Sequence, residues 1–369
     1  MTASFEQFDY QLRSNKHIER KLVFDLLSRA RKYFPLEDYK YLGLGSLWFA
    51  DHRLAHKLLN ITDLISIEAS EYAARANFNK PYGSVRVIPG MSHEVLPQFK
   101  ADDWNVPYLV WMDYDGLLDE NVEADLSRFV TNLQPGSVIL VTLNAAFRSY
   151  KTNQTGIAAA EKRGETIDPR AVEKLIRFLG NVVPEEYLLK GKSGKLQDTT
   201  SAEFPEVMAE SILKYLSHKV VASGRLGDAV AKEEDVSTND GEENRGVSES
   251  KKLAKKPLCF VPLFNIFHKD GADMITVGGA LSSEKDAESW RSLLATDPVL
   301  KSKDGIPIYH QLDLIPITLR EKMVLDSLLP SAVPLGQVAL DSGLKIDDEQ
   351  IEKYRQHYRH FPMFFESPL

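Results

Sequence analysis

Short apolar runs alternate with helical patterns along most of this chain. Strand-like runs occupy residues 41–44, 64–67, 84–88, 108–112 and 137–143. Between them, apolar residues recur three or four positions apart, which is the period of a helix packed on one face. Strands separated by helices need crossover connections, which are right-handed and give a parallel sheet. The sequence therefore predicts a doubly wound α/β fold, with strands apolar throughout because helices cover both faces.

A helical extension is expected before this domain, over residues 1–38. Ile18, Leu22 and Leu26 lie four apart and predict one amphipathic helix over residues 15–33. We expect the basic residues of this helix to form a solvated face, although some could reach the mouth of an active site. They are Lys16, Arg20, Lys21, Arg29, Arg31 and Lys32.

The α/β domain is expected to span residues 39–282, with two interruptions. The first is an expected insertion of about residues 152–200 over the carboxyl ends of the strands, where loops that recognise substrates are usually built. Residues 227–256 are polar and almost without large apolar side chains, so they predict a flexible loop within the domain. Residues 283–369 predict a small helical C-terminal extension, with helices over 319–329 and 347–357.

Two long apolar runs, 258–268 and 274–277, flank the dipeptide Asp270-Gly271. Asp-Gly between apolar runs is a hairpin signal. A hairpin that closes a parallel sheet is expected to place one antiparallel strand at the edge of that sheet.

The stretch 39–70 predicts a strand, a tight turn, a helix and a second strand. The first strand ends on Gly43 and Gly45, Ser46 is the expected helix cap, and Glu68 ends the second strand. Glycines let a ligand approach the backbone at a helix N-terminus, and a carboxylate at this spacing accepts ribose hydroxyls. The alternative is two ordinary turn glycines and a solvated glutamate. The order of strand, turn, helix and acid favours a nucleotide site.

A dinucleotide site would need a third glycine where Trp48 stands. Instead, these residues resemble the class I S-adenosylmethionine-dependent methyltransferases, whose first motif is a G-x-G turn and whose second is an acid ending the second strand. The resemblance covers about residues 39–280. It implies a mostly parallel seven-stranded sheet with an antiparallel C-terminal hairpin, whereas the dinucleotide-binding fold ends on parallel strands.

The resemblance also implies S-adenosylmethionine as the cofactor. The family holds adenine in the loop after the third strand, where Met91, Ser92 and His93 stand, and the acid often found in that loop is absent before Glu94. The implied cofactor-binding residues are Gly43, Gly45, Ser46, Glu68, Ala69, Met91, Ser92 and Asp113.

The family's fourth motif matches the residues after the fourth strand, and the expected catalytic residues are Asp113, Tyr114, Asp115 and Asn144. An acid here could take a proton from the nucleophile, and Tyr114 could line the transfer channel. The prolines of the Asp-Pro-Pro-Tyr signature of base-methylating enzymes are absent. Asp113 and Asn144 match two positions of the metal site in catechol-type enzymes, but Leu143 replaces the third. A divalent metal is therefore an alternative, and no metal ligands are assigned; Asp113 could also be only a structural cap.

Composition narrows the class of protein. The 53 acidic and 45 basic residues give a net charge of −8, which argues against a broadly basic nucleic-acid surface but leaves a local patch open. Cys259 is the only cysteine, so no intramolecular disulfide can form, as expected in the cytoplasm. No apolar stretch approaches the length of a membrane span.

The predicted function is transfer of a methyl group from S-adenosylmethionine to an oxygen or nitrogen of an acceptor. That acceptor could be a small molecule, a protein or a nucleic acid, and the sequence does not indicate an oligomeric state. One alternative is a catalytically inactive, methyltransferase-like nucleotide-binding module that acts in a protein assembly. A third hypothesis is a nicotinamide-dependent oxidoreductase.

Overall fold

The computed structural model describes residues 13–164, 168–188, 197–229, 255–341 and 343–362. Most of the predicted loop 227–256 lies outside the described residues. The helices are α2 Ser14–Ala30, α3 Ala50–Leu59, α4 Ser70–Asn79, α5 Ser92–Val95, α6 Glu120–Asn132, α7 Phe147–Tyr150, α8 Gln154–Glu161, α9 Ala171–Leu179, α10 Glu185–Leu188, α11 Phe204–Ala222, α12 Glu284–Ala295, α13 Leu319–Ser327, α14 Gly336–Asp341 and α15 Asp348–His357. Short 3-10 turns are η2 Leu36–Asp38, η3 Leu96–Gln98 and η4 Ala101–Trp104.

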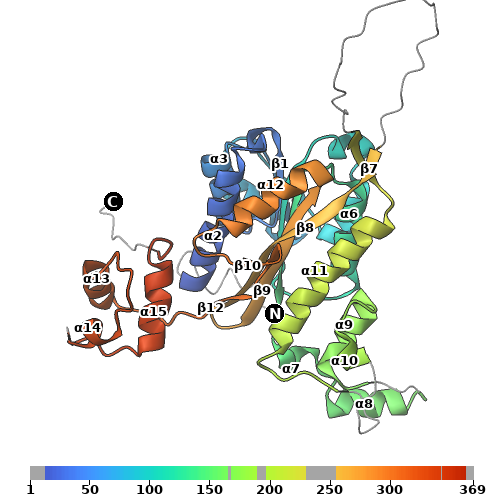
Figure 1. Ribbon diagram of the computed structural model, residues 1–369. Coiled ribbons are helices and arrows are strands. Elements are labelled where there is room, and N and C mark those ends of the chain that lie inside the picture. The colour runs from blue at the N-terminus through green and yellow to red at the C-terminus, as the bar shows by residue number, and fades with distance from the viewer. Residues whose placement is uncertain (1–12, 165–167, 189–196, 230–254, 342, 363–369) are drawn as a thin grey trace, which may run out of the picture.

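One large sheet forms the centre of the molecule (Figure 1). Its order among the described strands is β12-β8-β9-β5-β4-β1-β2-β3. The strands of this sheet are β1 Lys40–Gly43, β2 Asp63–Glu68, β3 Val85–Pro89, β4 Tyr108–Asp113, β5 Val138–Asn144, β8 Cys259–Lys269, β9 Asp273–Ser282 and β12 His310–Leu312. Two small pairs stand outside it: β6 Leu226–Ala229 with β7 Lys255–Pro257, and β10 Ser302–Lys303 with β11 Ile306–Pro307.

The predicted doubly wound fold and its C-terminal hairpin are confirmed. Strands β1 to β5 are parallel, and β9 runs antiparallel to both β5 and β8. The antiparallel strand is not at the edge as expected, because β8 lies outside it and pairs in turn with β12. The three-residue β12 adds an eighth strand to the seven expected. It is too short to produce a periodic pattern in the sequence.

Helices cover both faces of the sheet (Figure 1), so each strand has to bury side chains on two sides. Alternate residues of a strand point to opposite faces. In β4, Leu109 and Trp111 belong to the core beneath α2 and α12. Their neighbours Val110 and Met112 belong to the second core, beneath α6 and α11. This explains why the strand is apolar at nearly every position.

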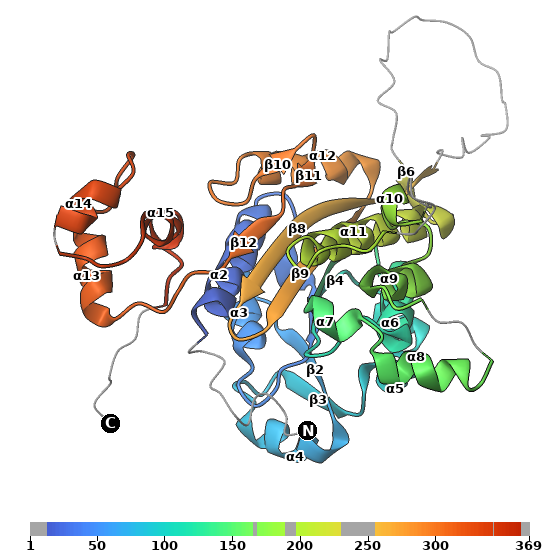
Figure 2. The same cartoon turned by 90° about the horizontal axis from the view of Figure 1, so that it is seen from below.

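The C-terminal helices α13 to α15 lie to one side of the sheet, in both Figure 1 and Figure 2. At the end of this group the ring centroids of Tyr354 and Phe361 lie 5.1 Å apart, and both side chains are buried. The preceding helix α12 packs instead on the sheet, where Trp290 stacks on Phe34. In the described parts of the chain, no helix is long and apolar enough to cross a membrane.

Candidate functional site

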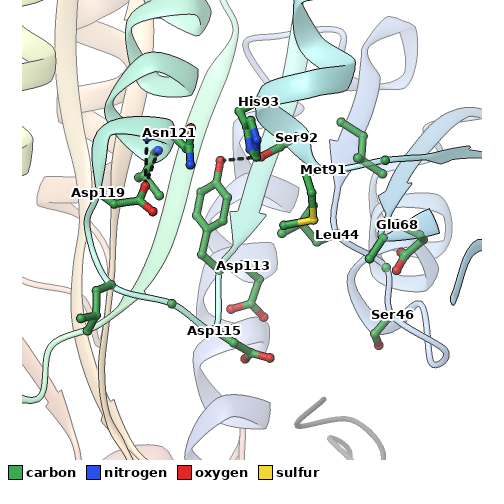
Figure 3. A pocket seen from close by; sticks show the side chains of 18 of the residues that line it. Leu44, Ser46, Glu68, Met91, Ser92, His93, Asp113, Asp115, Asp119 and Asn121 are labelled. Carbon is green, nitrogen blue, oxygen red and sulfur yellow. Dashed lines mark hydrogen bonds between the residues drawn. The ribbon is translucent and has the colours of Figure 1, made fainter. Parts of the chain in front are cut away.

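Two cavities open at the carboxyl edge of the sheet, and they share Asp113 and Asp115. The first has a volume of about 750 Å³ and is lined by the loops that follow β1, β2, β3 and β4. Lys174 and Phe178 of α9 also line it, which places part of the predicted insertion beside the site. Figure 3 shows Glu68 and Ser46 on one side of this cavity and Asp113 and Asp115 on the other.

The turn after β1 differs from the predicted helix cap. Helix α3 begins at Ala50, and Ser46 does not cap it, because Ser46 and Phe49 both have left-handed backbone angles (φ 50° and 51°). The chain therefore makes an extra turn before the helix begins. Gly45 is essential to this turn, since a Cβ there would lie 2.6 Å from both the Phe49 ring and Ser66 Oγ. As a result, the backbone of this turn forms one wall of the first cavity.

Gly43 does not line this cavity. A Cβ at Gly43 would meet the Tyr41 hydroxyl at 2.8 Å and the Trp111 carbonyl at 2.9 Å. Glycine is therefore needed at this position because β1 packs closely against its neighbours. Direct approach of a ligand to this residue is not supported by the geometry.

Glu68 ends β2 and points into the first cavity next to the turn (Figure 3). Ser66 Oγ donates to Glu68 Oε1 at 2.6 Å and accepts the Gly45 N–H at 2.9 Å. Burial raises the pKa of Glu68 to about 7, although Ser66 and the backbone of Gly45 and Ser46 hold it lower than burial alone would. Glu68 is thus an acceptor aimed at a ligand beside the glycine turn.

The loop after β3 forms the wall of the first cavity opposite the turn after β1. Met91 is 51% exposed, and its N–H donates to Glu94 at 3.2 Å, so Glu94 serves the start of α5. The Tyr114 hydroxyl donates to Asp125 Oδ2 at 2.7 Å and lies 3.4 Å from Ser92 Oγ. Burial and then Asp125 raise the pKa of Tyr114 well above its usual value. Tyr114 therefore stays protonated and shapes the wall between the loops after β3 and β4.

Asp113, at the end of β4, is held by two cations from the N-terminal helix. Lys16 Nζ lies 3.0 Å from Asp113 Oδ1, and Arg20 lies 3.6 Å from Oδ2 and 2.6 Å from Asp51. The sequence prediction of a solvated basic face is wrong for Lys16 and Arg20, which are 3% and 7% exposed. It failed because both residues continue the helical stripe of Val23 and Leu27, which is buried as well.

The same helix reaches the second cavity. Lys16 Nζ also lies 2.9 Å from Glu19 Oε2, and Glu19 Oε1 lies 3.2 Å from His268 Nδ1 on β8. Burial alone would raise the pKa of Glu19, but His268 and Lys16 outweigh it and hold the pKa below the usual range. A chain of ionisable groups within ion-pair distance of one another therefore runs from Asp113 to His268. We name Lys16, Glu19, Arg20, Asp51, Asp113 and His268 the α2 charge cluster.

The second cavity has a volume of about 440 Å³ and lies between α2, the ends of β4 and β5, and the β8–β9 turn. Asn144 lines this cavity and not the first. Its Oδ1 accepts the Ala146 N–H at 2.8 Å, which leaves its NH₂ group available. Asp270 accepts the Lys16 N–H at 2.7 Å and so caps the start of α2.

The structure brings most of the predicted site residues together at one edge of the sheet. Gly45, Ser46, Glu68, Ala69, Met91, Ser92, Asp113, Tyr114 and Asp115 line the first cavity. Gly43 lies behind its wall, and Asn144 faces the second cavity. Across the described ranges, no group of three or more His, Cys, Asp or Glu side chains is arranged to hold a metal ion.

Sequence reasoning missed Glu19, Asp51 and His268, and misjudged Lys16 and Arg20. One signal was present: residues 16, 19, 20, 23 and 27 follow the three-four spacing of a single helix face, with charge at one end and apolar side chains at the other. A charged run that shares a face with an apolar stripe is expected to be buried with partners. No comparable signal marks His268, which stands inside an apolar strand.

A model of the family described as "Putative O-methyltransferase" matches residues 8–369. The chain has no match among curated proteins. It is similar to a solved probable spermidine synthase from Corynebacterium glutamicum, with 13% identity over 39% of this chain and 54% of that one, and a TM-score of 0.29. An O-methyltransferase family protein from Burkholderia thailandensis has 8% identity over 73% of this chain and 60% of that one, with a TM-score of 0.28. Human N-acetylserotonin methyltransferase in complex with S-adenosylmethionine has 10% identity over 73% and 57%, with a TM-score of 0.29. In all three cases the chain covers less than two thirds of the other protein.

Proposed function

The chain belongs to this O-methyltransferase family, whose members depend on S-adenosylmethionine, and from that premise we propose how its own residues bind the donor and methylate a hydroxyl group. We propose that the donor binds in the first cavity. The observation that carries the proposal is Glu68, a buried acceptor beside the Gly45 turn with no cationic partner among the described residues. A carboxylate in that place suits the two hydroxyls of a ribose.

The remaining walls supply the other contacts that the donor needs. Arg20 lines the cavity near Gly45 and can receive the donor's carboxylate, while Asp113 can receive its ammonium group. Ala69 and the exposed Met91 offer apolar contact to adenine, with Ser92 as a polar neighbour. A dinucleotide fits less well, because Trp48 lines the cavity where a third glycine would stand.

When bound, S-adenosylmethionine supplies an electrophilic methyl group for direct displacement by an oxygen. The protein then has to align the acceptor and remove one proton. We assign alignment to Asp115 and Asn144, which face the second cavity. Asp113 is less suited to proton removal than the sequence suggested, because Lys16 and Arg20 engage its two oxygens. We propose that it orients the donor, with Tyr114 as the wall beside it.

We also propose that transfer needs no divalent metal. Leu143 replaces one acid of the catechol-type site, and the Lys16 ammonium sits beside Asp113 Oδ1, where a metal ion would have to bind. An internal cation thus supplies the positive charge at this carboxylate. Residues 39–282 as the cofactor-binding domain, with extensions at 1–38 and 283–369, and a cytoplasmic location remain proposals from the sequence.

Calorimetry with S-adenosylhomocysteine and with NAD tests the donor site. We expect S-adenosylhomocysteine to bind and NAD to bind more weakly or not at all; tighter binding of NAD would overturn the proposal. Incubation with methyl-labelled donor and cell extract, fractionated by molecular size, then tests activity. If the protein binds S-adenosylhomocysteine but transfers no methyl label to any fraction of the extract, the inactive binding module would be favoured.

A further inference from the structure

His268 lines the second cavity from β8 and is 4% exposed. Its Nδ1 lies 3.2 Å from Glu19 Oε1, and the Glu19 side chain is fully buried. The structure gives Nε2 no hydrogen-bond partner among the described residues, while Nδ1 faces the carboxylate. A histidine oriented by a buried acid on one ring nitrogen, with the other nitrogen open to a cavity, is the arrangement of a general base.

Asp113, Asp270 and Lys16, which also line this cavity, are less suited to taking a proton. Asp113 is engaged by Lys16 and Arg20, and Asp270 accepts the N–H groups of Asn15 and Lys16 at 3.3 Å and 2.7 Å. The Lys16 ammonium is itself held between two carboxylates, 2.9 and 3.0 Å away, and its pKa is raised by Asp113 and Glu19 despite burial. It therefore remains charged and cannot act as the base.

We propose that the second cavity receives the methyl acceptor, a small polar alcohol, and that His268 is the catalytic base for its hydroxyl group. This rests on the proposed function, because the donor has to lie in the adjoining cavity. The cavities meet at Asp113 and Asp115, so the acceptor oxygen can face the methyl group there. A volume of about 440 Å³ and a lining without Phe, Tyr or Trp, in the part of the chain described, favour a compact hydrogen-bonding molecule.

The proton and electron balance is simple. The hydroxyl proton passes to His268 Nε2 as the oxygen lone pair forms the new bond to the methyl carbon. The bond from that carbon to sulfur breaks with both electrons remaining on sulfur, which loses its positive charge. Glu19 stabilises the imidazolium ion that forms, and water takes the proton afterwards. Glu19 does not touch the acceptor, so it is a positioning residue.

The first test is His268→Gln, which keeps a polar side chain of similar size but removes the base. The probe is methyl-labelled S-adenosylmethionine with the dialysable fraction of a cell extract. We expect transfer to fall about 100-fold or more, as loss of a general base does, with unchanged affinity for S-adenosylhomocysteine. The control is His218→Gln, on the exposed side of α11, which should leave transfer unchanged.

Two outcomes would overturn the proposal while leaving the proposed function intact. One is full transfer by His268→Gln; the other is no label in the dialysable fraction while the whole extract is labelled in its protein or nucleic acid. If the wild type does not bind S-adenosylhomocysteine at all, the proposed function itself fails. The two failures are therefore distinguishable by calorimetry.

A second variant tests the cavity without touching the charge cluster. Ala272 lies in the exposed β8–β9 turn and lines the second cavity, so Ala272→Trp should fill it. We expect transfer to be lost and binding of S-adenosylhomocysteine to be kept. Ala222→Trp, at the exposed end of α11, is the matched control. Unchanged KM and kcat in Ala272→Trp would contradict an acceptor site here.

The role of Glu19 has a spectroscopic readout that does not depend on activity. In nitrogen-15 NMR of labelled histidine, we expect the His268 Nδ1 signal to report the Glu19 carboxylate 3.2 Å away, and to shift in Glu19→Gln. Glu19→Asp should recover part of the signal and part of kcat. An unchanged His268 signal in folded Glu19→Gln would show that Glu19 does not orient the ring.

Discussion

The two cavities share Asp113 and Asp115, yet they are built in different ways. The first is made mostly by loops that each follow a strand of the sheet directly, so most of its residues come from local strand-turn-helix units; Arg20 of α2 and two residues of α9 are the exceptions. The second joins α2 to a hairpin turn, and its contacts include Asn15 with Asp270, which are 255 positions apart. Most residues of the proposed donor site are thus determined by nearby sequence, whereas those of the proposed acceptor site depend on packing between distant segments.

Two buried glutamates, one beside each cavity, differ in the charged groups that surround them. Glu68, in the first cavity, has a hydroxyl and backbone N–H groups beside it but no cation from the described residues, and burial raises its pKa to about 7. Glu19, behind the second cavity, lies against Lys16 and His268, and its pKa falls below the usual range. Glu68 thus retains the capacity to bind a ligand, while Glu19 is fixed by the protein itself.

The largest expected effect concerns the α2 charge cluster. Arg20→Ala leaves the buried Asp51 without its cationic partner and leaves the partly buried Asp113 with Lys16 alone, so the free energy of unfolding should fall by about 3–5 kcal/mol. Urea unfolding measures this. The control is Arg31→Ala, whose half-exposed pair with Glu37 should contribute less than about 1 kcal/mol. Equal effects of the two changes would mean that the cluster does not hold α2 in place.

A smaller effect is expected at Glu68. Glu68→Ala removes the acceptor for the ribose hydroxyls, so affinity for S-adenosylhomocysteine should fall by roughly 1–3 kcal/mol in calorimetry. Glu71→Ala, on the exposed side of α4, provides the control and should bind normally. Binding by folded Glu68→Ala that equals the wild type would place the donor elsewhere.

The pKa of Glu68 gives a pH dependence with a definite sign. The carboxylate accepts ribose hydroxyls best when ionised, and its ionised fraction falls as pH drops through about 7. Affinity for S-adenosylhomocysteine should therefore decrease about tenfold from pH 8 to pH 6, following the protonation equilibrium. In Glu68→Gln this dependence should disappear; a variant that keeps it would assign the titration to another group.

The smallest expected effect is that of removing divalent metals. With Lys16 beside Asp113, dialysis against EDTA should leave methyl transfer unchanged within error. Loss of activity that Mg²⁺ restores would show that a metal ion displaces Lys16 from this carboxylate.

The difference between features set by nearby residues and features set by distant packing also explains what the sequence could predict. The strands, the hairpin and Glu68 follow from short-range periodicity and turn chemistry, because each is determined within a few residues. The start of α3 could not be predicted this way. Phe49 is fully buried with a left-handed backbone, and tertiary packing around Gly45 overrides the capping preference of Ser46. His268 could not be recognised because its importance depends on Glu19, which belongs to a distant helix.

The position of α2 in the chain also has a consequence for folding. Asn15 and Lys16 leave the ribosome before Asp270, which caps their helix and is made 255 and 254 positions later. Closing so long a loop is slow and costs chain entropy, whereas the strand-turn-helix units close locally. We infer that refolding chains regain binding of S-adenosylhomocysteine before they regain methyl transfer, a delay that stopped-flow binding and activity measurements would detect. Of these two segments, the one made earlier would then reach its final position only after the later one is complete.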